Sequence, residues 1–198
     1  MQIHSADFVT SSPDLDNCPE SGLAEFAFIG RSNVGKSSLI NTLTQKKDLA
    51  MVSATPGRTR LINFFLINRK WHLVDLPGYG YAKASGHHRN KFNEFVSDYL
   101  LNRTNLSCVF VLIDSRLSPQ KIDLEFTQWL MEHEIPFVLI FTKTDKIKAG
   151  VLKQNMALFF EAMSEFCDGL PRSYDCSAKT GEGRKQILGF VEQALSNH

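Results

Sequence analysis

The sequence predicts a three-layer α/β fold, with a mostly parallel sheet of six strands, one antiparallel strand among them, and helices on both faces. Apolar runs that fit buried strands alternate with amphipathic segments that fit helices, as in a parallel sheet covered on both sides. Two of the runs flank the short polar segment 68–70, which is the pattern of a hairpin and predicts the antiparallel strand. A glycine-rich turn joins the first apolar run directly to a helical segment.

Each element follows from its own local pattern. Residues 1 to about 22 are polar and contain Pro13, Pro19 and Gly22, so we expect an N-terminal extension ahead of a single domain over 23–198. The expected strands are 25–29, 61–67, 71–75, 108–113, 137–141 and 172–176. The first expected helix begins with 38–43, and a polar loop follows at 45–60. The other expected helices cover 91–101, 124–131, 152–166 and 187–195.

Composition excludes several classes of protein. The 198 residues are 43% hydrophobic, which is enough for a proper core, and the net charge of +1 argues against a general polyanion binder. The four cysteines are scattered without a C-x-x-C pair, which favours reduced thiols over disulfides or a zinc site. No apolar run approaches the length of a membrane span, and the polar N-terminal region does not resemble a signal peptide. We therefore expect a soluble cytoplasmic protein.

Residues 30–37 match G-x-x-x-x-G-K-[ST] in the context that this motif requires, between an apolar run and a helical segment. A strand that turns through two glycines into a helix directs several backbone N–H groups at one point, beside the positive end of the helix dipole. Lys36 can reach the β- and γ-phosphates of a nucleotide, and the hydroxyl of Ser37 is placed to bind Mg²⁺. The predicted phosphate loop comprises Gly30, Arg31, Ser32, Asn33, Val34, Gly35, Lys36, Ser37 and Ser38.

A second motif, Asp75-Leu76-Pro77-Gly78, follows the strand expected at 71–75. An aspartate at the carboxyl end of a strand can meet Mg²⁺ through water, and a glycine lets its backbone N–H approach a γ-phosphate closely. Alone, D-x-x-G is a common pattern. Some forty residues after a phosphate loop, it becomes a strong indication of a nucleotide site.

Two further segments are suited to reading a base. Thr142-Lys143-Thr144-Asp145 follows the strand at 137–141, and a carboxylate at Asp145 could accept from both N1–H and N2–H₂ of guanine, a donor pair that adenine lacks. The aliphatic stem of Lys143 could cover the ring. In Ser177-Ala178-Lys179, the N–H of Ala178 could meet guanine O6 and Lys179 could flank the ring. Each segment alone also fits a polar turn at the surface.

Together and in this order, these segments resemble the translation-factor-related GTPases, whose five motifs correspond to 30–37, Thr59, 75–78, 142–145 and 177–179. Two strings narrow the resemblance to the EngB (YihA/YsxC) ribosome-biogenesis GTPases over roughly residues 22 to 195. They are Thr55-Pro56-Gly57-Arg58-Thr59 and Asp75-Leu76-Pro77-Gly78-Tyr79-Gly80-Tyr81, with Thr-Lys-x-Asp in place of Asn-Lys-x-Asp.

The resemblance implies a monomeric GTPase that binds GTP and GDP, with the segment 55–59 contributing to the nucleotide site. It implies Mg²⁺ held by Ser37, Thr59 and, through water, Asp75, and catalytic roles for Lys36, Thr59 and Gly78. Tyr79 stands where many GTPases carry a water-orienting glutamine, so slow hydrolysis is expected, and Thr142 in place of Asn suggests a weaker hold on nucleotide.

Two features keep alternatives open. Asn33 stands where related GTPases hold a potassium ion against the phosphates, but it also fits a turn that needs left-handed backbone. From Lys46 to Lys91, nine Lys and Arg residues stand against Asp48 and Asp75, which predicts a basic face or a charge that neutralises nucleotide. Lys83, Arg89 and Lys91 in this segment are needed by no nucleotide motif and are therefore the best partner contacts, unless they only solubilise a loop.

The function implied by the resemblance is a nucleotide-dependent switch that binds the precursor of the large ribosomal subunit and is needed for normal cell division and septation. A second hypothesis is a GTP-gated binding module that barely hydrolyses GTP. A third is an ATP-using P-loop kinase, against which Asp145 argues.

Overall fold

The computed structural model describes residues 1–50, 61–79 and 86–196, with backbone alone for 86–93. Its seven-stranded sheet has the order β1-β3-β4-β2-β5-β6-β7, in which β3 pairs antiparallel with both neighbours and every other pairing is parallel. One strand therefore runs against the other six, as predicted. The strands are β1 (Ala6–Ser12), β2 (Glu25–Gly30), β3 (Ile62–Ile67), β4 (Trp71–Asp75), β5 (Leu106–Asp114), β6 (Phe137–Thr142) and β7 (Ser173–Asp175).

The predicted count of six strands is wrong, because β1 forms within the segment expected to be an extension. This strand lies at the edge of the sheet and pairs with β3 through its backbone, with an irregularity between Phe8 and Thr10. Phe8 and Val9 are exposed, so the strand has no continuous apolar side that a sequence pattern could reveal. The predicted division of the chain near residue 22 stays a prediction, although β1 is part of the sheet.

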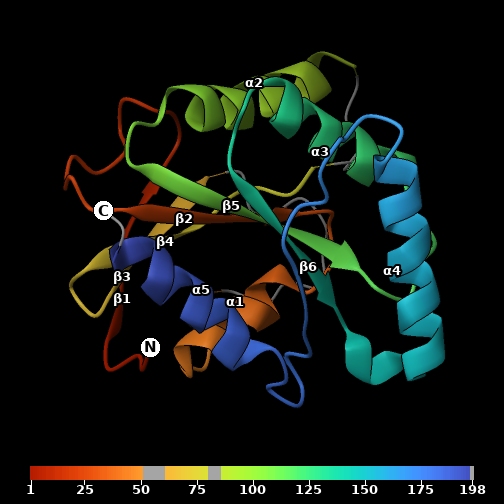
Figure 1. Ribbon diagram of the computed structural model, residues 1–198. Coiled ribbons are helices and arrows are strands. Elements are labelled where there is room, and N and C mark those ends of the chain that lie inside the picture. The colour runs from red at the N-terminus through yellow and green to blue at the C-terminus, as the bar shows by residue number, and fades with distance from the viewer. Residues whose placement is uncertain (51–60, 80–85, 197–198) are drawn as a thin grey trace.

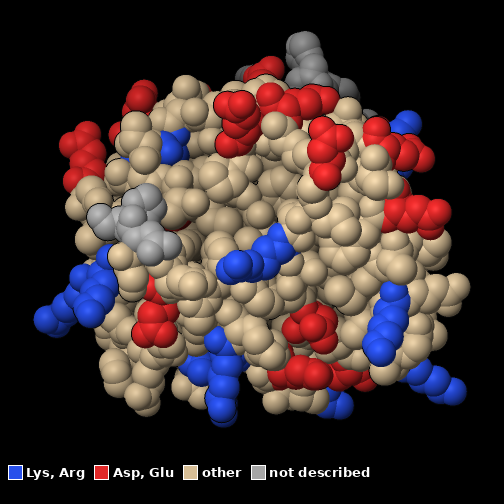
Figure 2. All heavy atoms as spheres, viewed as in Figure 1, with Lys and Arg blue, Asp and Glu red and all other residues tan. Residues whose placement is uncertain are grey.

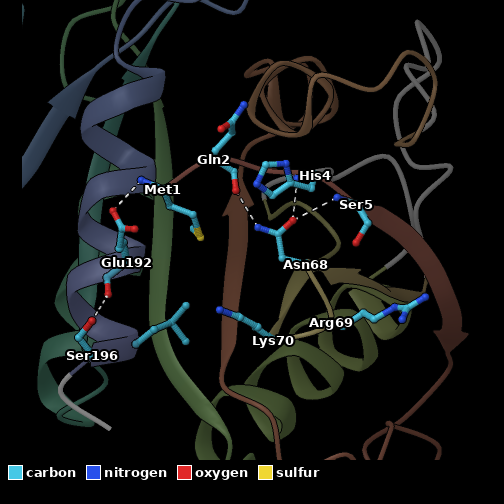
Figure 3. A pocket seen from close by; sticks show the side chains of 10 residues that line it. Met1, Gln2, His4, Ser5, Asn68, Arg69, Lys70, Glu192 and Ser196 are labelled. Carbon is cyan, nitrogen blue, oxygen red and sulfur yellow. Dashed lines mark hydrogen bonds and ion pairs between the residues drawn. The ribbon is translucent and has the colours of Figure 1, made fainter.

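Asn68, in the turn between β3 and β4, holds the segment before β1 in place (Figure 3). Its Oδ1 accepts hydrogen bonds from the backbone N–H groups of His4 (2.7 Å) and Ser5 (3.1 Å). Its Nδ2 donates to the carbonyl of Gln2 at 2.8 Å. One side chain of the hairpin turn therefore satisfies three backbone groups that lie more than sixty residues earlier.

Helices cover both faces of the sheet (Figure 1). Helices α1 and α5 pack on one face with Phe26 and Phe28 of β2, while α2, α3 and α4 contribute to the core on the other face, with Ala27 and Ile29. Alternate residues of one strand thus face two separate cores, which explains why the run is apolar throughout. The helices are α1 (Lys36–Thr44), α2 (Gly86–Asn102), α3 (Lys121–Glu132), α4 (Ala149–Met163) and α5 (Arg184–Ser196), with a short 3₁₀ helix at Thr144–Lys146.

This arrangement brings the sequence motifs together at the carboxyl ends of the parallel strands. Strands β2, β4, β5, β6 and β7 run in the same direction, so the loops that follow them open at the same end. Ligands of open α/β sheets bind at this end. In the part of the chain that the structure describes, no helix is long and apolar enough to cross a bilayer.

Candidate functional site

The phosphate loop follows β2 and leads directly into α1. Gly35 caps the helix with φ 103°, and Asn33 adopts φ 63°, so both lie in left-handed backbone. A Cβ atom on Gly30 would lie 2.8 Å from the carbonyl oxygen of Leu112 in the neighbouring strand, so only glycine fits there. The geometry of Asn33 agrees with its alternative interpretation as a turn residue. The potassium ion beside Asn33 stays a prediction.

The segment 142–145, which is predicted to read the base, is bonded directly to the predicted phosphate loop. The buried hydroxyl of Thr142 lies 2.7 Å from the carbonyl oxygen of Val34 and 3.2 Å from that of Ile113. Lys143 donates from Nζ to the carbonyl oxygen of Asn33 at 2.5 Å, and its stem passes close to Gly35. A nucleotide bound to one segment would therefore lie against the other.

Asp114, at the end of β5, holds Lys143 in this position and belongs to no motif found in the sequence. Its Oδ2 accepts from Lys143 Nζ at 2.9 Å and from Arg116 Nη2 at 2.8 Å. Burial alone would raise the pKa of this carboxyl, but the hydrogen bonds from Arg116 and Lys143 outweigh it and lower the pKa to about 2. The carboxylate is thus charged at neutral pH and anchors Lys143 over the phosphate loop.

Lys36 and Asp75 lie together where the phosphate loop meets the end of β4. Lys36 Nζ is in contact with Asp75 Oδ1, and both side chains are largely buried. The cation expected to reach the phosphates and the carboxylate expected to meet Mg²⁺ are therefore neighbours, with Ser37 in the first turn of α1 beside Lys36. Hydroxyl and carboxylate oxygens are ligands that suit Mg²⁺, which usually takes the rest from phosphates and water. Among the described residues, no group of three or more His, Cys, Asp or Glu could hold a metal by itself.

Gly78 lies directly against the phosphate loop. A Cβ atom there would come within 2.6 Å of the Gly30 carbonyl oxygen, and the next residue, Tyr79, forms an isolated bridge with Arg31. Leu76, between Asp75 and Pro77, is buried and donates its backbone N–H to the Phe28 carbonyl at 3.0 Å. The second motif is therefore held close to the first by backbone contacts.

The segments 142–145 and 177–179 meet at Asp145. Ser177 donates from Oγ to Asp145 Oδ1 at 2.7 Å, and the backbone N–H groups of Lys179 and Thr180 each donate to Ser177 Oγ at 3.2 Å. The hydrogen bond from Ser177 lowers the pKa of Asp145, with a smaller contribution from the charge of Lys146. Asp145 is therefore available as a charged acceptor. The carbonyl of Ala178 accepts from Thr42 in α1 at 2.9 Å, which links this loop to the phosphate helix.

Tyr79 is buried, although it follows the glycine of the second motif. Its ring stacks on Phe126, with centroids 4.5 Å apart, and its hydroxyl donates to Asp123 Oδ1 at 2.9 Å. Burial, together with the nearby negative charge of Asp123, raises the pKa of Tyr79 well above its ordinary value. The phenol therefore stays protonated at neutral pH and cannot take a proton from water, which agrees with the expectation that Tyr79 does not replace the water-orienting glutamine of other GTPases.

Part of the predicted site lies outside the described residues. This applies to Thr55, Pro56, Gly57, Arg58, Thr59 and Lys83, and to the side chains of Arg89 and Lys91.

Comparison with known proteins agrees with the geometry. Residues 25–143 match the model of a family described as 50S ribosome-binding GTPase. "Probable GTP-binding protein EngB" of Bacteroides thetaiotaomicron is 53% identical over 192 residues, which cover 97% of this chain and 95% of that protein. The protein of the same name from Christiangramia forsetii is also 53% identical and covers 97% of each chain.

A solved structure supports the same assignment. The crystal structure of a probable GTP-binding protein engB superposes with a TM-score of 0.71 at 26% identity, covering 88% of this chain and 100% of that one. Sequence identity over nearly the full length, a matching family model and a shared fold thus point in the same direction. The chain belongs to the EngB family of GTP-binding proteins, within the 50S ribosome-binding GTPases.

Proposed function

We propose that this protein binds GTP and GDP, hydrolyses GTP slowly, and acts as a nucleotide-dependent switch in the assembly of the large ribosomal subunit. The observation that supports this most directly is the bond between Thr142 and the carbonyl of Val34. It holds the guanine-reading segment against the phosphate loop, with Asp145 oriented by Ser177 on the same side of the sheet. This arrangement suits a guanine nucleotide better than the ATP of a P-loop kinase, because adenine offers no donor pair to Asp145.

Each residue of the site has a proposed role in binding and hydrolysis. Lys36 would leave Asp75 to bind the β- and γ-phosphates, while Ser37, Thr59 and, through water, Asp75 would hold Mg²⁺. The ion neutralises charge on the phosphates when it is bound. The backbone N–H of Gly78 binds the γ-phosphate, so Lys36, Thr59 and Gly78 stabilise the transferring group. The remaining contacts to GTP come from the other residues of 30–38, 55–59, 75–78, 142–145 and 177–179.

Slow hydrolysis follows from the position of Tyr79. Its hydroxyl is bonded to Asp123 and its ring is stacked on Phe126, so it offers no free group to orient water. A potassium ion beside Asn33 would supply positive charge near the phosphates instead. Higher GTP turnover in potassium than in sodium would support this proposal and would count against a binding module that barely hydrolyses GTP.

The partner is proposed to be the precursor of the large ribosomal subunit, and the same activity is proposed to be needed for normal cell division and septation. The description of the matching family and the EngB relatives support this partner. On the face shown in Figure 2, acidic side chains gather along the upper edge, over α2 and α3, while Lys and Arg lie singly. The proposed contact is made by Lys83, Arg89 and Lys91 of the basic segment 46–91, because such cations attract RNA phosphates.

Co-sedimentation with large ribosomal subunits tests this function. We expect the protein to bind subunits more tightly with a non-hydrolysable GTP analogue than with GDP, and binding should weaken steeply as salt rises. Changing Lys83, Arg89 and Lys91 together to Glu should abolish co-sedimentation while GTP affinity stays near that of the wild type. Equal binding in both nucleotide states would contradict a switch, and normal binding of the triple variant would move the contact elsewhere.

The single hydrogen of the Thr142 hydroxyl leads to a prediction about base recognition. Because the hydroxyl lies within hydrogen-bond distance of the carbonyls of Val34 and Ile113, its one hydrogen is used there, and Thr142 has none left for N7 of guanine. We expect 7-deaza-GDP, in which N7 is replaced by C–H, to bind within about twofold of GDP. The variant Thr142→Asn has two amide hydrogens and should prefer GDP over 7-deaza-GDP by several-fold, since one net hydrogen bond contributes about 1 kcal/mol.

Calorimetric titration of both proteins with both nucleotides measures this preference. A tenfold preference of the wild type for GDP would show that another donor reads N7. An unchanged ratio in Thr142→Asn would show that residue 142 does not face the base at all.

A further inference from the structure

Asp123, on α3, joins the two loops of the phosphate site. Arg31 of the phosphate loop donates from Nε to both carboxylate oxygens, at 3.0 and 3.1 Å. Tyr79, which follows Gly78, donates from its hydroxyl to Oδ1 at 2.9 Å. The Asp123 side chain is only 1% exposed, so these bonds are shielded from water. No motif in the sequence includes this residue.

The three side chains depend on one another for their stability. A buried carboxylate is unfavourable unless it is paired, and here burial raises the pKa of Asp123 while the charge of Arg31 opposes that rise. If the carboxylate were lost, the guanidinium of Arg31 and the hydroxyl of Tyr79 would lose their partner in a largely buried place. The cluster therefore restrains the backbone at positions 31 and 79, on both sides of the close contact between Gly78 and Gly30.

A row of stacked rings extends from this cluster along α3. Tyr79 stacks on Phe126, and Phe126 lies nearly parallel to Trp129, with centroids 6.2 Å apart and an interplanar angle of 19°. Trp129 in turn lies 4.5 Å from the ring of His133. The spacing of 126, 129 and 133 places these side chains on one face of the helix. A displacement of Tyr79 would therefore change the surroundings of Trp129.

We propose that Asp123 is a positioning residue of the nucleotide site, which aligns Arg31 and Tyr79 and couples the backbone at Gly78 to helix α3. The proposal rests on the proposed function, since Gly78 is expected to respond to a γ-phosphate. Asp123 itself is not expected to touch the nucleotide. It acts through the two residues that it binds.

Tryptophan fluorescence provides a direct test, because the chain contains only Trp71 and Trp129. Addition of a non-hydrolysable GTP analogue with Mg²⁺ should change the emission of the wild type, and Trp129→Phe should remove that change. In Asp123→Asn most of the change should disappear, and affinity for the analogue should fall about tenfold, as for the loss of one hydrogen bond to a charged group. GDP affinity should fall less, because GDP does not reach Gly78.

A matched control is Glu125→Gln, which removes the same charge from the same helix. Glu125 is exposed, and its carboxylate lies 3.6 Å from Lys121 Nζ on the helix surface. This variant should retain the wild-type emission change and affinity. If Asp123→Asn does not fold, Tyr79→Phe replaces it, since this change removes only one hydroxyl and should reduce the emission change in the same direction.

The outcomes separate this inference from the proposed function. Folded Asp123→Asn with the wild-type emission change and the wild-type preference for the analogue over GDP would overturn the positioning role. If Asp123→Asn is unfolded, a wild-type emission change in Tyr79→Phe would overturn the positioning role as well. The same holds if the wild type binds the analogue without any change in the emission of Trp129. Failure of the wild type to prefer guanine over adenine nucleotides would instead refute the proposed function.

Discussion

Replacing Asp145 by Asn should reduce GTP affinity about a hundredfold or more and should admit xanthosine triphosphate in its place. Ser177 orients the Asp145 carboxylate at 2.7 Å, and both oxygens carry negative charge at neutral pH. Two hydrogen bonds from guanine to a charged acceptor contribute roughly 3 kcal/mol or more together, which corresponds to this loss. An Asn amide would donate to O2 of xanthine, where guanine has an amino group.

Competition between labelled GDP and unlabelled GTP, XTP or ATP measures the switch in base preference. Asp168→Asn, at an exposed position between α4 and β7 and outside every motif, makes the same change in charge and should bind GTP like the wild type. If Asp145→Asn keeps its preference for GTP over XTP, the segment 142–145 does not read the base.

Replacing Gly183 by Ala should destabilise the fold by about 2–4 kcal/mol. Gly183 precedes α5 with φ 81°, and a Cβ atom there would lie 2.7 Å from the Cβ of Cys176 and still closer to the Asp175 carbonyl. Left-handed backbone costs a residue with a side chain about 1 kcal/mol, and overpacking against a backbone that cannot move adds roughly 1–3 kcal/mol. The loop that carries Ser177 should be displaced first, because the backbone N–H of Ser177 donates to the carbonyl of Glu182, the residue before Gly183.

The same loop contains the control, Gly181. Its φ is 79°, but no atom of the described residues lies within 4 Å of the place that a Cβ atom would take, so Gly181→Ala should lose only about 1 kcal/mol from backbone strain. Urea unfolding curves of the two variants give the difference in the free energy of unfolding. Equal losses would show that the contact with Cys176 and Asp175 relaxes without cost.

The sequence was sufficient for those features that are encoded within a short stretch of chain. The turn from 30 to 37 needs glycines and a lysine at a set spacing, and the hairpin at 68–70 needs only two apolar runs and a polar turn. The alternation of apolar runs and helices predicted the parallel sheet, and the hairpin predicted its one antiparallel strand. The same alternation implied that the loops after 75, 141 and 176 would meet at one edge.

Edge pairing could not be predicted in this way. Strand β1 is stabilised by backbone hydrogen bonds to β3 and by Asn68, and such bonds leave no apolar pattern in residues 6–12. Its sequence therefore resembles a polar extension, and the predicted sheet was one strand short.

Only the tertiary structure revealed the polar contacts between distant parts of the chain. Arg31 and Asp123 are 92 residues apart, Thr142 and Val34 are 108 apart, and Glu25, the first residue of an apolar run, is buried against Arg103 and Tyr99. A carboxylate in the sequence looks the same whether it will be solvated or buried, since its partner is chosen by the packing of whole elements. The sequence by itself therefore determined the fold class and the loops of the nucleotide site, whose turns are local. The folded chain decided which charges are buried and what orients those loops, because burial and pairing depend on distances that local spacing does not encode.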